Sequence, residues 1–155
     1  MKALHYPSGA VVTYTPDSAG RFTSAVDSVN SINYVTSAAY QADGQMTDFV
    51  SGNGAALGGI ASAFTYNKRL QPVNMSASTP SQTVFSIGYD FHAGTGTAGS
   101  GTDNGNVWSI FNYRDRTRDQ SFTYDQLNRL TSAQNAGTNC AASTVNGKTE
   151  YWGNS

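Results

Sequence analysis

The stretch SFTYDQLNRLTSA (residues 121–133) carries the signals of a complete β-hairpin. Before Tyr124, aromatic residues alternate with small polar ones, a pattern typical of a strand that is buried on one face. The next four residues, 125–128, are turn formers that tolerate positive φ or bond their own backbone. Arg129 and Leu130 then begin a return strand, because successive side chains of a strand point to opposite faces. We therefore predict a strand, a tight turn and a second strand.

Similar units precede this hairpin along the chain. Tyr14, Tyr40 and Tyr66 each follow an alternating segment and precede turn-forming residues, and they are spaced 26 residues apart. The interval from Tyr66 to Tyr124 is 58 residues, slightly more than two periods, with a Tyr-Asp pair at 89–90 between them. A hairpin of this size cannot bury its apolar face alone, so neighbouring hairpins must share one sheet.

The repeats predict an all-β fold class: tandem β-hairpin repeats forming a continuous antiparallel, solenoid-like curved sheet. We expect Tyr14, Tyr40, Tyr66 and Tyr124 to stack as an aromatic ladder along one face. The chain has 155 residues, which fits a single domain over 1–155. The expected repeats cover roughly 6–30, 31–55, 56–80 and 81–135, followed by a tail at 136–155.

The composition agrees with this fold and excludes several functions. Only 12% of the residues are charged, against about 25% in an ordinary globular chain, so exposed helices are poorly supplied. The net charge of −1 gives no electrostatic reason to bind nucleic acid. The apolar runs are too short to insert into a membrane, and the N-terminus has no signal peptide. The single cysteine, Cys140, cannot form an internal disulfide.

No catalytic or cofactor motif has the context that it needs. A glycine pattern at 94–99 resembles a dinucleotide-binding loop, but the residues after it cannot start the required helix. His5 and His92 have no partner at metal-ligand spacing. We expect no cofactor, no metal and no enzyme activity. A Ser–His–Asp triad assembled by the fold stays open, because triads are defined by geometry.

One charge cluster lies at residues 111–119. If this segment is a strand, its alternation places Arg114, Arg116 and Arg118 on one face, about 6.8 Å apart. Such a row of guanidinium groups could bind the sulfate, carboxylate or phosphate groups of an acidic glycan. The alternative is a solvated sheet face on which the arginines pair with aspartates and discourage aggregation.

The sequence Tyr-Asp-x-x-Asn-Arg-Leu at 124–130 resembles the YD repeat of the Rhs family, found in Rhs toxins, insecticidal-toxin shells and teneurins. The resemblance covers roughly residues 6–135, with Thr15, Gln41 and Asn67 standing where the family has aspartate. It implies a β-solenoid or spiralling sheet, a role at the cell surface or outside the cell, and carbohydrate binding. The chain contains no Asp-Pro pair, so the family's self-cleavage element and a C-terminal toxin are not expected.

Together these features predict a non-catalytic scaffold or interaction module of a surface or secreted protein. Unpaired strand edges favour self-association, or binding of another protein by addition of a strand. One alternative is binding of polysaccharide, an acidic glycan along the three arginines. Another is a protein effector that blocks a partner such as an extracellular hydrolase, with the loop at 92–106 as the inserted part.

Overall fold

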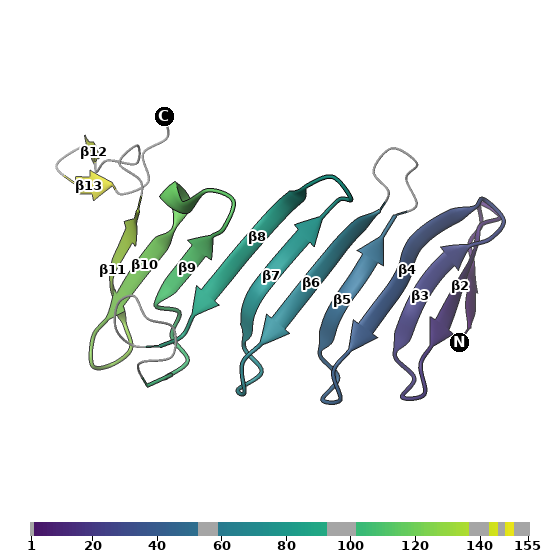
Figure 1. Cartoon of the computed structure of the whole chain (residues 1–155), viewed down its shortest axis with the longest axis horizontal. Helices are drawn as coiled ribbons and strands as arrows, with labels where there is room; N and C mark the ends of the chain where they lie inside the picture. The colour runs from purple at the N-terminus through teal and green to yellow at the C-terminus, as the bar shows by residue number, and fades with distance from the viewer. Residues whose placement is uncertain (1, 53–58, 93–101, 137–142, 146–147, 151–155) are drawn as a thin grey trace. The chain divides into compact units, whose positions relative to one another are not determined.

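The computed structural model describes residues 2–52, 59–92, 102–136, 143–145 and 148–150, and in them the regular structure is almost entirely β (Figure 1). The elements are β1 (Ala3–His5), β2 (Val11–Pro16), β3 (Phe22–Asp27), β4 (Ile32–Tyr40), β5 (Met46–Ser51), β6 (Ile60–Tyr66), β7 (Pro72–Ser78), β8 (Thr83–Asp90), β9 (Ser109–Asn112), the short 3₁₀ helix η1 (Arg116–Arg118), β10 (Gln120–Tyr124), β11 (Leu130–Asn135), β12 (Ser143–Val145) and β13 (Lys148–Glu150).

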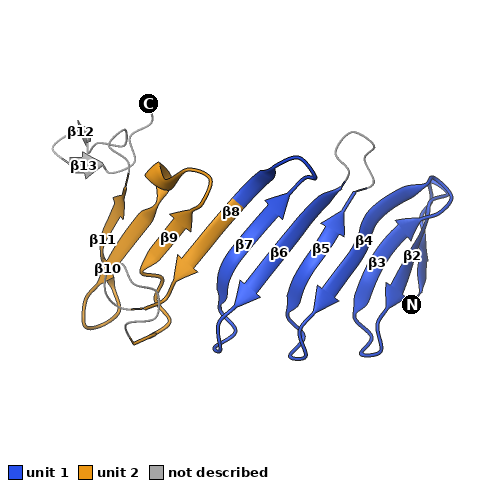
Figure 2. Cartoon of the chain, in the orientation of Figure 1, with its two compact units in different colours: residues 1–85 blue, residues 86–155 orange. Residues whose placement is uncertain are grey.

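The chain divides into two compact units, residues 1–85 and 86–155, with the boundary inside β8 (Figure 2). In the first unit, β1 to β7 lie side by side in chain order. In the second unit, β8 to β11 do the same, and β12 and β13 form a separate two-stranded sheet. Every strand pair described in either unit is antiparallel. The predicted all-β class of tandem antiparallel hairpins is confirmed.

Each strand has a half-buried face and an exposed face. In β6, Ser62, Phe64 and Tyr66 are half-buried, while the residues between them are exposed. The same alternation runs through β10. Aromatic side chains gather on the half-buried face, where the rings of Phe49 and Phe64 stack with centroids 6.0 Å apart. The strands predicted at 11–14, 32–35, 64–66 and 121–124 all lie inside observed strands.

The described residues enclose very little core. Val12, Ala38 and Phe91 are the buried apolar side chains among them, and Asp27 and Asp90 are the buried charged ones. A single-layer sheet has no second layer to cover its apolar face, so its side chains shield one another only from the side. Lateral strand pairing and the turns must therefore carry most of the specificity of this fold.

Several sequence features lie partly or wholly outside the described residues. β12 and β13 pair antiparallel, which confirms the hairpin predicted near the C-terminus, although residues 146 and 147 of its turn are not described. The glycine pattern at 94–99 and Cys140 are also outside. The single domain over 1–155 and its four repeats stay predictions. Within the described part of the chain, no helix has the length and hydropathy needed to cross a membrane.

Candidate functional site

The turn between β10 and β11 is closed by its own aspartate. The amide of Asp125 donates to the carbonyl of Arg129 (2.9 Å), and the amide of Asn128 donates back to the carbonyl of Asp125 (3.0 Å). The Asp125 carboxylate accepts the amides of Leu127 and Arg129, both at 2.9 Å, and bonds Arg129 Nε at 2.6 Å. Asn128 takes a positive φ of 59°. Asparagine tolerates this left-handed conformation better than most residues.

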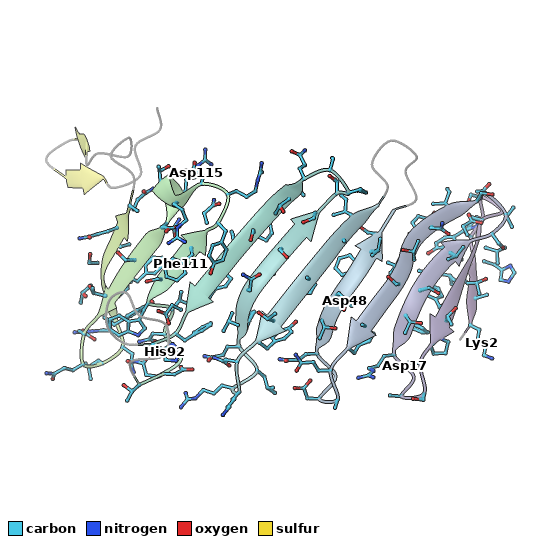
Figure 3. The ribbon with its side chains drawn as sticks, viewed as in Figure 1. Lys2, Asp17, Asp48, His92, Phe111 and Asp115 are labelled. Atoms are coloured by element: carbon cyan, nitrogen blue, oxygen red, sulfur yellow. The ribbon has the colours of Figure 1, made fainter. Side chains whose placement is uncertain are left out.

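The turn between β2 and β3 repeats this arrangement in the other unit (Figure 3). Asp17 accepts the amides of Ala19 and Arg21, both at 2.9 Å, and Arg21 Nε at 2.8 Å. Gly20, with φ of 81°, stands where the other turn has asparagine. The Arg21 amide is the main reason why the pKa of Asp17 lies below its usual value, since hydrogen bonds favour the ionised carboxylate. The Arg129 amide lowers the pKa of Asp125 in the same way.

Two further turns keep the backbone without the acid. The amide of Gln41 donates to the carbonyl of Gln45 (2.7 Å), and the amide of Asn67 donates to the carbonyl of Gln71 (3.0 Å). The positive φ falls at Gly44 (94°) and at Leu70 (65°). We call the four turns at 17–21, 41–45, 67–71 and 125–129 the tyrosine hairpin turns, because a tyrosine precedes three of them.

Each of these three tyrosines bonds the preceding hairpin. Their hydroxyls donate to backbone carbonyls: Tyr40 to Phe22 (2.7 Å), Tyr66 to Met46 (2.9 Å) and Tyr124 to Val107 (2.7 Å). The three acceptors are the residues that lead into β3, β5 and β9. No ring contact among the described residues joins two of these tyrosines. The predicted stacked ladder is therefore corrected to a series of hydroxyl–carbonyl steps.

Tyr14 does not belong to this series. Pro16 pairs with Phe22 as Tyr66 pairs with Pro72, so proline occupies the equivalent position in the first hairpin. Tyr14 lies two residues earlier, where its ring packs against Phe22 with centroids 5.2 Å apart. Burial, and then the neighbouring Tyr6, raise the pKa of Tyr14.

The equal spacing from Tyr14 to Tyr40 misplaced the first repeat by two residues. Asp17, rather than Thr15, stands where the YD repeat has aspartate. The better signal was the turn itself, since Asp-x-x-Gly-Arg-Phe at 17–22 matches Asp-x-x-Asn-Arg-Leu at 125–130.

The last residue of each turn forms a second link that the sequence did not reveal. Arg21 Nη1 donates to the carbonyl of Gln41 (2.7 Å), and its guanidinium lies 5.0 Å from the centre of the Tyr40 ring. Gln45 Nε2 donates to the carbonyl of Leu70 (2.8 Å). Neighbouring hairpins in the first unit are thus joined twice at this end, by a tyrosine hydroxyl and by a side-chain N–H.

The three predicted ligand-binding arginines lie in a turn, not in a strand. β9 ends at Asn112, and η1 carries Arg116 and Arg118. Asp115 closes this turn by accepting the amide (3.1 Å) and the hydroxyl of Thr117. That hydroxyl is the main cause of the lowered pKa of Asp115. The predicted strand over 111–119 is therefore wrong beyond Asn112.

The arginines of this turn are held by their own aspartates. Arg116 pairs with Asp119 (2.7 Å) and lies over the rings of Phe111 and Tyr113, 5.1 and 5.6 Å from their centres. Arg118 pairs with Asp115 (3.0 Å). The amide of Arg114 donates to the side chain of Asn112 (3.1 Å). The turn gathers the three arginines without aligning them in a row, and their role in ligand binding stays a prediction.

Two other features have chemical interest. Buried Asp90 accepts both the amide (2.9 Å) and the ring Nδ1 (2.8 Å) of His92, which holds the chain as it leaves β8. The described residues contain no group of three or more side chains that could hold a metal ion. In the first unit, a groove of about 300 Å³ lies on the aromatic face, lined by Tyr14, Phe22, Ser24, Ala25, Val35, Ala38, Tyr40, Met46 and Phe49.

Comparison with known proteins supports the fold. No protein-family model and no curated protein matches the chain. Solved structures of Tc toxin complexes do match it. They include a TcdB2–TccC3–Cdc42 complex (TM-score 0.66, 20% identity) and a Tc holotoxin pore of Photorhabdus luminescens (TM-score 0.64, 20% identity). A TcdB2–TccC3 structure without its hypervariable C-terminal region gives a TM-score of 0.65 at 21% identity.

Each match covers 86% of this chain and 6% of the other chain. The chain therefore spans a small part of the length of these structural neighbours. At this level of identity the likeness concerns the fold alone, and that fold is Rhs-like.

Proposed function

We propose that this protein is a non-catalytic β-repeat scaffold that binds other proteins. The observation that carries the proposal is the repeated link between hairpins. Tyr40, Tyr66 and Tyr124 all bond the hairpin before them through the same atoms. This arrangement holds strands in register over a single-layer sheet that buries few side chains, and it invests the sequence in a surface rather than in a catalytic pocket.

The structural neighbours support the same role. Their titles describe assemblies of several proteins, among them a complex of TcdB2, TccC3 and Cdc42. By the Rhs resemblance, we place the scaffold outside the cell or at the cell surface. Its partner is another protein or a second copy of this chain, bound by pairing along a strand edge.

Sedimentation of the full chain over a range of concentrations tests the edge-pairing part of this function. We expect association that increases with concentration. The variant Gln134→Lys, on the exposed face of β11, should reduce it because a lysine on an edge strand hinders pairing with another chain. Ala63→Lys is the matched control, since Ala63 is exposed on a strand that has neighbours on both sides. A monodisperse monomer at high concentration would contradict the proposal of self-association.

Binding of an acidic glycan is the second candidate. It is favoured by the exposure of the arginine side chains at the β9–β10 turn, 60% for Arg116 and 74% for Arg118. Replacing Arg114, Arg116 and Arg118 by glutamine should abolish salt-sensitive retention on a sulfated polysaccharide column. Unchanged retention would remove this candidate. The effector role assigned to the loop at 92–106 stays a prediction, because residues 93–101 lie outside the described part of the chain.

A further inference from the structure

We propose that the turn end of β11 is a socket for a tyrosine-bearing β-hairpin of another polypeptide. The socket consists of the Arg129 side chain and the backbone carbonyl of Leu130. The inference rests on the proposed scaffold function and deepens it, because it states which kind of strand the edge selects.

The filled junctions of the first unit define what such a socket does. Where β4 lies beside β3, the Phe22 carbonyl accepts the Tyr40 hydroxyl at 2.7 Å. The neighbouring Arg21 donates to the Gln41 carbonyl and covers the face of the Tyr40 ring. Where β6 lies beside β5, Met46 and Gln45 play the same two roles toward the next hairpin. Two different sequences therefore build one junction with the same two kinds of bond.

The hairpin of β10 and β11 carries the same parts. Arg129 and Leu130 follow Asp125 as Arg21 and Phe22 follow Asp17, with the same pairing across the turn. Both arginines bond their aspartate through Nε. Their exposure differs: the side chain of Arg21 is 30% exposed and that of Arg129 is 74% exposed.

The difference in exposure follows from the neighbour of each hairpin. β3 has β4 beside it, whereas β11 is the last strand in the order of its sheet among the described residues. All the contacts described for the Arg129 side chain are with Asp125, so the donors that Arg21 uses across its junction are available on Arg129.

The geometry also specifies the partner. The incoming strand must run antiparallel to β11 and end in a tyrosine whose hydroxyl reaches the Leu130 carbonyl. The turn after that tyrosine must present a carbonyl to Arg129. The edge strand β1 of a second copy does not fit, because the residue that precedes its turn is His5. The partner is a different polypeptide that carries a hairpin of the tyrosine type.

A cyclised hairpin peptide with the sequence of residues 60–78 is the appropriate probe. It contains β6 and β7, and its β6 strand already docks beside β5 within this chain. Titrated into the full-length protein, it should shift the amide NMR signals of Arg129 and of β11. A Tyr66→Phe version of the peptide should bind about fivefold more weakly, because one net hydrogen bond is lost.

A matched pair of protein variants tests the arginine. Arg129→Ala should weaken binding of the peptide several-fold, whereas Arg118→Ala should leave it unchanged. The two side chains are equally exposed, at 74%, and each pairs with one aspartate. Circular dichroism of both variants checks that the sheet is intact.

Three results would overturn the socket: no binding, equal binding of the tyrosine and phenylalanine peptides, or shifts confined to other strands. None of them bears on the sedimentation test with Gln134→Lys. Failure of the socket is thereby distinguished from failure of the scaffold.

Discussion

The two kinds of turn in this protein differ in how freely they vary. The four tyrosine hairpin turns share one backbone, with a positive φ at their fourth residue. The turns that link one hairpin to the next are each closed in a different way. Buried Asp27 accepts the amides of Val29 and Asn30, Thr79 closes the turn before β8, and η1 occupies the turn after β9.

The difference shows where the sequence is constrained. A tyrosine hairpin turn must present a carbonyl and a side-chain donor to the next hairpin, so a change in its backbone would misplace both. A linking turn bonds mainly within itself, and any closure that joins its two strands is sufficient. The repeat is therefore defined by contacts between hairpins rather than by the hairpins alone.

Acid should have the largest effect. The pKa values of Asp17, Asp27, Asp115 and Asp125 are all lowered in the folded protein by the hydrogen bonds that they accept. A lowered pKa contributes stability that is complete above the unfolded value of about 3.9 and is lost as the pH falls through the folded value. We therefore expect cooperative loss of the sheet below about pH 4, measured by circular dichroism.

Hydrogen exchange on the way to that loss separates the turns. The amide of Arg129 should lose protection as Asp125 is protonated. The amide of Gln71, which bonds the neutral side chain of Asn67, should keep its protection at the same pH. Equal loss in both turns would show that the carboxylates are not what closes them.

Replacement of Asp27 by alanine should be the most damaging single substitution in a linking turn. Asp27 is fully buried, and its carboxylate also bonds Asn30 Nδ2 at 2.7 Å. Without it, several amide groups are left without an acceptor. We expect the melting temperature to fall by about 5 °C or more, with Asp27→Asn, which keeps one acceptor oxygen, falling less. Equal melting of the wild type and Asp27→Ala would mean that this turn closes without its side chain.

The features that could be predicted from the sequence are those fixed by neighbouring residues. Alternation located the strands, and the Asp-x-x-Asn-Arg pattern of 125–129 located the turn because the aspartate bonds residues two and four positions later. The acceptors of the tyrosine hydroxyls were not predictable. They depend on the register between hairpins, and β6 shifts register between Thr65 and Tyr66.

The arginine segment was misjudged because its pattern fits two structures. Arg and Asp alternate at 114–116 and again at 118–119, which suggests a strand of period two. The pairs that form are Asp115 with Arg118 and Arg116 with Asp119, each three residues apart. That spacing is the period of a 3₁₀ helix, and the hydroxyl of Thr117 on Asp115 favours it further.

A reciprocal exchange at the fourth turn position tests the shared backbone. Leu70 adopts a φ of 65°, which costs an L-residue about 1–2 kcal/mol, and its side chain is 51% exposed. Leu70→Gly should therefore stabilise the protein by about 1 kcal/mol in urea unfolding. Gly44→Leu should destabilise it by a similar amount, since no atom lies near enough for a new side chain to pack against. Destabilisation by both would show that the Leu70 side chain matters more than its backbone.

Removal of a single tyrosine hydroxyl should have the smallest effect and is the most direct test of the comparison. Tyr66→Phe leaves the half-buried ring in place and deletes only the bond to the Met46 carbonyl. We expect a loss of about 1 kcal/mol in urea unfolding, the usual net value of one hydrogen bond. Tyr34→Phe, at an exposed ring outside the tyrosine hairpin turns, is the control and should change stability by less than about 0.5 kcal/mol.

The location of the change matters more than its size. If the hydroxyl joins two hairpins, Tyr66→Phe should increase hydrogen exchange in β5, which it does not belong to, as well as in β6. An effect confined to β6 and β7 would mean that each hairpin stands alone and that the hydroxyl–carbonyl bond does not hold neighbours in register. The repeat would then be defined within the hairpin, and the contrast between the two kinds of turn would need another cause.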